Sequence, residues 1–254
     1  AVGRQTDLNA ASFWLTTDLK DNEAIVWNLG WSGWAVKTKR HLLIFDYWAQ
    51  DPGEAPSLGN GHINPAQIQD LDVVVFISHE HGDHFDPAVL EWAETVKSVR
   101  YVFGWKPFDN PVYNYLSESR EQRKIGDIEV TTLHARSDVH EAAFLVRADG
   151  VVVFHPGDYT GFHTGREDTY KAEYDFLSTI YEQVDIAFFN GKSESNEYML
   201  NSLSPKIAFP QHSPEYYTYK GQTQELEERI PNVRFFYAEN RGERFVYSNG
   251  RLID

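Results

Sequence analysis

Residues 78–87 read Ser-His-Glu-His-Gly-Asp-His-Phe-Asp-Pro, and the rest of the chain is interpreted outward from them. They follow the largely apolar run 71–77, whose continuous Val-Val-Val-Phe-Ile is typical of a strand buried on both faces. Side chains that commonly bind metals therefore leave the end of one strand, namely His79, His81, Asp83 and His84. A chance group of histidines on a surface loop is the alternative, but it explains neither the alternating spacing nor the position after a strand. The stretch predicts a metal site.

The spacing within this stretch predicts two neighbouring metal positions. Residues two apart point the same way in an extended segment, so His79 and His81 can reach one metal together. Asp83 and His84 lie past Gly82, where the backbone can turn and present them to a second position. Zinc usually takes about four ligands, so both positions need further ligands from distant segments.

Candidates for these distant ligands stand at the ends of other predicted strands. They are His134 or His140, Asp158 and His212. Asp158 follows a Pro-Gly turn, and its single carboxylate can contact both ions. His134 and His140 compete for the third ligand position of the first metal. We favour His140 because it immediately precedes the predicted strand 143–147, and His134 would then orient a ligand or be an ordinary strand residue.

The charge and the cysteine content of the chain limit the kinds of partner that it is expected to bind. The chain of 254 residues has 23 Lys plus Arg against 38 Asp plus Glu, and its formal charge of −15 opposes binding to nucleic acid or to an anionic membrane surface. Because there is no Cys, disulfides and thiolate catalysis are excluded and a metal must be held by His and carboxylates. The expected partner is a small-molecule substrate, which can be anionic if bound cations attract it. The sequence leaves a homo-oligomer open.

The sequence predicts neither a membrane span nor a signal peptide. No apolar run approaches the roughly 18 residues of a spanning helix, and no charged segment followed by an apolar one opens the chain. We therefore expect a cytoplasmic protein, with a processed, exported form as the alternative because the sequence begins with Ala1.

Strands and helices alternate in both halves of the chain. Strands are predicted at 24–29, 34–38, 41–48, 71–78, 99–104, 128–134, 143–147, 151–155, 185–189, 207–209, 233–237 and 244–247. Helices are predicted at 65–70, 88–97, 167–181, 196–203 and 222–230, with Asp86 and Pro87 beginning the second. The charged stretch before Lys124 is interpreted as a solvated face. We expect an α/β protein with one domain over 1–254, made of a β-rich N-terminal half (23–125) and a C-terminal half (126–254), with two sheets between outer helices.

These features together resemble the metallo-β-lactamase superfamily. The signature His-x-His-x-Asp-His runs from His79 to His84, Asp46 follows an upstream apolar strand, and His140, Asp158 and His212 come later in the expected order. The resemblance implies a four-layer αββα sandwich. More narrowly, the segments 29–34, 43–48 and 155–158 are similar to a lactonase-like and phosphodiesterase-like branch of hydrolases that includes ascorbate-6-phosphate lactonase.

The resemblance also implies a ligand set for two divalent metal ions. It assigns His79, His81 and His140 to the first ion, Asp83, His84 and His212 to the second, and Asp158 to both. Zinc is the expected metal, with manganese or iron as alternatives. The residues beside His140 depart from the usual pattern, and a carboxylate from Asp138 or Glu141 in its place would favour manganese or iron.

The implied reaction is hydrolysis of a small ester, lactone or phosphodiester by water activated on the metals. Metal binding lowers the pKa of this water from 15.7 to about 7. Asp46 would orient a ligand imidazole, or it would only cap a loop. Asp83 could share proton transfer if it coordinates the metal only loosely. An iron-dependent redox enzyme of the same fold is a second hypothesis. Such proteins resemble a variant of the motif in which glutamate replaces the second histidine, so His81 argues against this hypothesis. A metal-binding member without turnover is a third.

Overall fold

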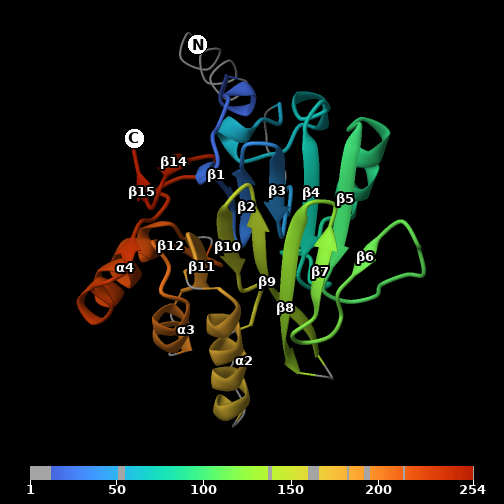
Figure 1. The fold of residues 1–254 in the computed structure, drawn as a ribbon. Coiled ribbons are helices and arrows are strands. Elements are labelled where there is room, and N and C mark those ends of the chain that lie inside the picture. The colour runs from blue at the N-terminus through green and yellow to red at the C-terminus, as the bar shows by residue number, and fades with distance from the viewer. Residues whose placement is uncertain are drawn as a thin grey trace.

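A computed structural model describes residues 13–50, 55–136, 139–159, 166–181, 183–191, 195–213 and 215–253, and all side chains within them except those of residues 135, 136, 139, 140 and 217. Two β-sheets face each other, and helices cover their outer surfaces (Figure 1). This arrangement confirms the predicted α/β sandwich. Among the described residues, each helix is too short or too polar to span a membrane.

The first sheet holds most of the N-terminal half. Its strands are β1 Glu23–Gly30, β2 Gly33–Lys37, β3 His41–Phe45, β4 Asp72–Ile77, β5 Ser98–Phe103, β6 Asn114–Tyr115, β14 Arg244–Ser248 and β15 Arg251–Leu252. Their order is β15-β14-β1-β2-β3-β4-β5-β6. From β3 to β6 the strands are parallel, so β3 and β4 end at the same edge of the sheet.

The second sheet holds most strands of the C-terminal half, together with β7 from the end of the N-terminal half. Its strands are β7 Gln122–Ile125, β8 Ile128–Arg136, β9 Val139–Ala148, β10 Val151–His155, β11 Ile186–Asn190, β12 Ile207–Gln211 and β13 Arg234–Phe235. The order is β13-β12-β11-β10-β9-β8-β7, and β10 to β13 are parallel. The loops after β10 and β12 therefore leave the same edge of this sheet.

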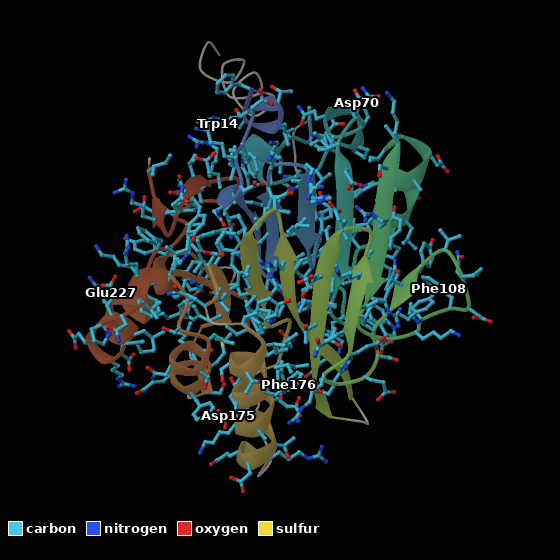
Figure 2. All side chains as sticks on the ribbon, viewed as in Figure 1. Trp14, Asp70, Phe108, Asp175, Phe176 and Glu227 are labelled. Atoms are coloured by element: carbon cyan, nitrogen blue, oxygen red, sulfur yellow. The ribbon has the colours of Figure 1, made fainter. Side chains whose placement is uncertain are left out.

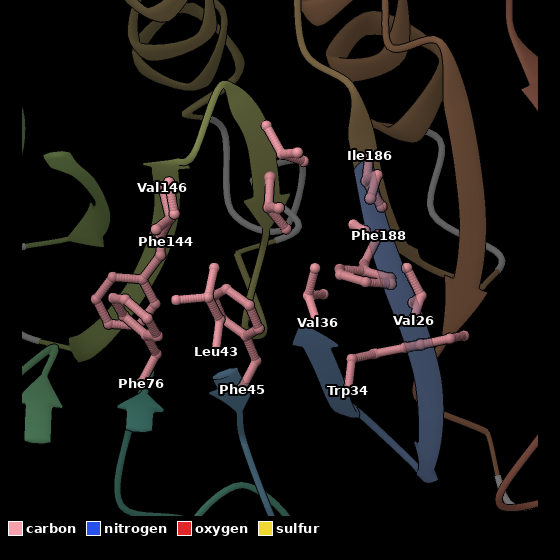
Figure 3. Close-up of a cluster of buried hydrophobic side chains, with 14 of the residues drawn as sticks. Val26, Trp34, Val36, Leu43, Phe45, Phe76, Phe144, Val146, Ile186 and Phe188 are labelled. Atoms are coloured by element: carbon pink, nitrogen blue, oxygen red, sulfur yellow. The ribbon is translucent and has the colours of Figure 1, made fainter. Parts of the chain in front are cut away.

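A hydrophobic core fills the space between the sheets. Strand β1 explains why it forms, since Ala24 and Val26 face the other sheet while Ile25 and Trp27 face the outer layer, in the period of two that strands impose. Aromatic rings meet across the interface, and Trp34 stacks on Phe188 with ring centroids 4.5 Å apart (Figure 3). Every residue of β1 except its two ends is buried, which explains the near-continuous apolar run in the sequence.

Helical segments close both outer faces. They are the 3₁₀ helices η1 Leu58–Asn60, η2 Pro65–Gln67 and η3 Pro87–Glu94, and the α-helices α2 Glu167–Ile180, α3 Ser195–Leu203 and α4 Tyr217–Arg229. Val89 and Trp92 of η3 pack on the first sheet, and α2 and α3 pack on the second.

Several elements differ from the sequence prediction. The helix expected at 88–97 is the 3₁₀ helix η3, whose buried residues Val89 and Trp92 are three apart, the spacing at which 3₁₀ side chains share one face. The strand expected to reach residue 48 ends at Phe45, because Asp46 has a φ of 42° and turns the chain. The charged stretch before Lys124 contributes the edge strand β7, whose first three residues are exposed.

Gly104 positions the loop that follows β4. Its N–H donates to the carbonyl oxygen of Ile77, 2.9 Å away, and the Ser78 carbonyl accepts the N–H of Ala142 from the second sheet at 3.2 Å. The backbone of residue 78 thus runs between the two sheets, with no room for a side chain at position 104.

Replacing Gly104 with Ala should destabilise the fold by about 1–3 kcal/mol, because the added Cβ would lie 2.4 Å from both the Ser78 carbonyl oxygen and Ala142 Cβ. Gly221→Ala is the matched control, since nothing lies within 4 Å of its Cβ position in α4 and Ala raises helix propensity. Urea unfolding should show a lower midpoint for Gly104→Ala only. Equal midpoints for the two variants would contradict the close approach.

Candidate metal centre

Two groups of metal-binding side chains meet at the edge of the sandwich where β3, β4, β10 and β12 end. Asp46 follows β3, the 78–84 loop follows β4, Asp158 follows β10 by three residues, and His212 follows β12 directly. Because both sheets contribute strand ends, residues more than a hundred positions apart become neighbours. The structure places the candidate ligands Asp158 and His212 beside the motif.

The first group consists of His79, His81 and Asp158, whose donor atoms all lie within 4.8 Å of one another. His79 Nε2 is 3.0 Å from His81 Nδ1 and 3.5 Å from Asp158 Oδ2. His79 is buried and His81 is exposed, so the group opens to solvent on one side.

The second group consists of Asp83, His84 and His212, again with donor atoms within 4.8 Å of one another. Asp83 Oδ2 lies 3.6 Å from His84 Nε2 and 3.4 Å from His212 Nε2. Both imidazole nitrogens are also 3.2 Å from Asp158 Oδ1. One carboxylate therefore presents Oδ2 to the first group and Oδ1 to the second, which is the geometry that a bridging ligand needs.

Three buried polar atoms test whether these residues fit a cation. His84 Nε2, His212 Nε2 and Asp158 Oδ1 lie together, and none has a hydrogen-bond partner among the described residues. An unpaired buried polar atom costs about 1–3 kcal/mol, so their convergence is unfavourable without a ligand. A divalent ion would accept lone pairs from all three, and the donor set of imidazoles and carboxylates suits such an ion.

Asp46 fixes the orientation of the motif. Its Oδ1 accepts the Ser78 N–H at 2.7 Å, and its Oδ2 accepts the Ser78 hydroxyl at 2.6 Å and His84 Nδ1–H at 2.7 Å. Nδ1 of His84 is thereby occupied, which leaves Nε2 for a metal. Asp46 also caps the loop backbone, so its contacts serve both of the roles that the sequence left open.

The electrostatics of the site favour positive charge at the second group. Burial opposes the charged form of His84, but Asp46 and Asp158 outweigh it and raise the pKa of His84 to about 10. Burial likewise opposes the carboxylate of Asp158, yet His84 holds its pKa at about 2. The carboxylates that stabilise a proton here would stabilise a metal ion in the same way.

The first group has the opposite character at His79. Burial, followed by the charge of His84, lowers the pKa of His79 to about 4. Its imidazole is therefore neutral at neutral pH and carries a lone pair on one ring nitrogen. Ser78 Oγ lies 2.9 Å from Nδ1 of His79, which leaves Nε2 facing His81 and Asp158.

The competition between His134 and His140 has a partial answer. His134 Nε2 lies 2.9 Å from the carbonyl oxygen of Leu116, and His134 belongs to neither group. The backbone of His140 lies in β9, and its side chain is outside the described part of the structure. Asp138 also lies outside the described residues, so His140 stays the predicted third ligand of the first metal.

Two residues support the site in ways that the sequence did not predict, namely Ser78 and His155. Ser78 contacts both Asp46 and His79, as described above. His155 is fully buried, donates Nε2–H to the carbonyl oxygen of Ser32 at 2.8 Å, and accepts the Gly157 N–H at Nδ1 at 3.2 Å. It thereby shapes the turn that presents Asp158. The segment His-Pro-Gly-Asp was the available signal, because a polar side chain before a Pro-Gly turn commonly binds the turn backbone.

Comparison with known proteins identifies the class of fold. Residues 25–212 match the family described as Beta-lactamase superfamily domain. The match covers most of the chain, and the protein belongs to this superfamily, as the motif indicated. No curated protein matches the sequence significantly.

Solved structures show the same fold at low sequence identity. Igni18, a metallo hydrolase from Ignicoccus hospitalis, aligns with a TM-score of 0.65 and 16% identity over 89% of this chain and 99% of its own. YhfI, a metallo-β-lactamase fold protein from Bacillus subtilis, aligns with 0.59 and 14% over 89% and 99%. CmlA, a diiron β-hydroxylase from Streptomyces venezuelae, aligns with 0.58 and 10% over 92% of this chain and 55% of its own. At these identities the likeness concerns the fold.

Asp46→Asn should lower the affinity for divalent metal by about 10–100-fold. The amide has one acceptor oxygen in place of two and no negative charge, so it would not accept all three hydrogen bonds and would hold His84 less firmly. Metal content after dialysis against a buffered metal series measures the effect. Asp109→Asn is the control, since Asp109 is 91% exposed and pairs only with Lys106 among the described salt bridges. Unchanged affinity in Asp46→Asn would refute the orienting role.

Proposed function

We propose that the protein is a metal-dependent hydrolase that acts on a small ester, lactone or phosphodiester. The observation that best supports this proposal is the pair of donor groups, which the two carboxylate oxygens of Asp158 connect. In this proposal His79, His81 and His140 hold the first ion, Asp83, His84 and His212 hold the second, and Asp158 contacts both. Zinc is the favoured metal, with manganese or iron as alternatives.

When bound, two divalent ions lower the pKa of water and polarise the oxygen of the bond to be cleaved. The chain supplies the rest of the mechanism. Asp46 keeps the proton of His84 on Nδ1, so the ligand stays in the correct tautomer. Asp83 is 30% exposed at its side chain and lies at the open side of the second group, where its carboxylate can accept a proton from the attacking water.

A nucleophile from the protein is not needed. There is no Cys in the chain, and the nearest motif hydroxyl, Ser78 Oγ, is fully buried and donates to Asp46. Two similarities support hydrolysis over other chemistry. Igni18 is described as a metallo hydrolase, and the segments 29–34, 43–48 and 155–158 resemble lactonase-like hydrolases.

An iron-dependent redox enzyme is the second candidate. CmlA, a diiron β-hydroxylase, shares the fold at 10% identity. His81 argues against this candidate, because the residue that contacts His79 in the first group is a histidine. The redox proteins resemble a variant with glutamate at this position. Stoichiometric iron without hydrolysis would favour it.

The function can be tested with a panel of lactones, phosphodiesters, phosphonate esters and β-lactams, assayed with Zn²⁺, Mn²⁺ and Fe²⁺ supplied separately. We expect turnover of at least one ester, lactone or phosphodiester, and loss of that turnover on dialysis against a chelator. Turnover that survives removal of the metal would contradict the proposal.

His81→Ala should remove both bound metal and hydrolysis while the protein stays folded, because His81 is an exposed member of the first group and its loss leaves no buried cavity. Glu80→Ala is the matched control, since this exposed neighbour in the same loop belongs to neither group. Metal analysis, circular dichroism and the hydrolysis assay should be run together. Full turnover in His81→Ala would refute the ligand assignment.

A further inference from the structure

Two tryptophans form an aromatic face beside the second donor group. The ring of Trp31 contacts the ring of His212 edge-on, with centroids 5.9 Å apart, and Trp48 lies against Trp31 at 5.7 Å. The His212 N–H donates to the carbonyl oxygen of Trp31 at 3.0 Å, which ties the face to the metal centre. Both indoles are only partly buried, so the face continues the open side of the site.

The backbone conformation of Trp31 is unfavourable for a bulky residue, which indicates a functional reason for tryptophan at this position. Its φ is 49°, in the left-handed region that bulky residues avoid. Gly30 precedes it in the same turn, and another glycine would make the turn without strain. Strain of this kind persists where the side chain or the carbonyl serves the site.

Arg241 fixes the backbone of the segment that carries the second indole. Its Nη2 donates to the carbonyl oxygens of Trp48 and Ala49 at 2.9 and 3.1 Å, and its Nη1 donates to Gln50 Oε1 at 3.1 Å. Gly61 leaves space for the side chain, because a Cβ there would lie 2.3 Å from Arg241 Cγ. The segment before β14 thereby fixes the loop that carries Trp48.

Asp86 ties the same loop to the metal-binding motif. Its Oδ2 accepts the Ala49 N–H at 3.2 Å, and its own N–H donates to the Tyr47 carbonyl at 3.2 Å. Trp48 is therefore held between Arg241 on one side and the end of the motif on the other. The face is fixed relative to His84 and His212 before any substrate arrives.

We propose that Trp31 and Trp48 bind a planar apolar group of the substrate, with Arg241 as a positioning residue for Trp48. This inference rests on the proposed function and specifies its substrate class, namely aryl-bearing esters or phosphoesters whose polar end lies at the donor groups. Indole rings offer flat, rigid surfaces for such a group. Pure rim packing is the competing explanation, and it predicts no preference between aryl and methyl ligands.

A pair of phosphonates separates these explanations without requiring turnover. The Zn²⁺-loaded protein is titrated with phenylphosphonate and with methylphosphonate in a calorimeter. We expect phenylphosphonate to bind about tenfold more tightly, as stacking and burial of one ring would give. Equal affinities, or no binding of phenylphosphonate, would overturn the inference. The hydrolysis panel does not enter this result, so the two proposals can fail separately.

Variants locate the preference. Trp48→Ala should bring the affinity ratio close to one while metal content and methylphosphonate affinity stay unchanged. Trp31→Gly should lower the same ratio, and glycine suits the φ at position 31. Trp48→Phe should keep most of the preference, and Arg241→Met should lose it. Trp14→Ala is the control, because Trp14, labelled in Figure 2, packs under Arg244 near the start of β1. Trp31 follows the other end of β1. An undiminished preference in both Trp48→Ala and Trp31→Gly would refute the assignment.

Discussion

The carboxylate of Asp46 is almost fully buried and accepts hydrogen bonds from the backbone and hydroxyl of Ser78 and from His84. A buried carboxylate is stable only while such partners remain, because an uncompensated buried charge costs several kcal/mol. Movement of the 78–84 loop away from Asp46 would therefore leave a buried carboxylate without its hydrogen-bond partners and destabilise the fold. The positive φ of Asp46 is a smaller cost that the same bonds offset. Orientation of both ligand groups follows from this one arrangement, since Ser78 also contacts His79.

The region beyond the family match packs against the loops around the donor groups. The match ends at residue 212, whereas Arg241 and strands β13, β14 and β15 lie after it. Strand β14 completes the first sheet by pairing with β1, and Arg241 fixes the loop of Trp48. The superfamily fold thus supplies the donor groups, while the C-terminal segment shapes what lies around them. This division agrees with the general rule that chemistry belongs to strand ends and specificity to loops.

Sequence predicted the donors better than their supports. His79, His81, Asp83 and His84 are adjacent and regularly spaced, so their pattern is local and readable. Asp158 and His212 could be proposed because each stands at a strand end. The roles of Ser78 and Arg241 depend on contacts with residues more than twenty positions away, which no local pattern records. His155 has a local signal in its Pro-Gly turn, but its bond to Ser32 spans 123 positions. The same limit applies to the strand β7, where pairing with β8 overrides the low strand propensity of charged residues.

Asp158 and His212 come from the second sheet, whereas His79, His81, Asp83 and His84 come from the first. Neither sheet alone holds a complete group, because Asp158 is a member of the first and His212 of the second. A metal that binds the folded protein and not the separated sheets adds its binding free energy to the docking of one sheet on the other. The ions would then act as a removable cross-link between the two halves of the chain. Occupancy of the centre and integrity of the sandwich become one coupled equilibrium.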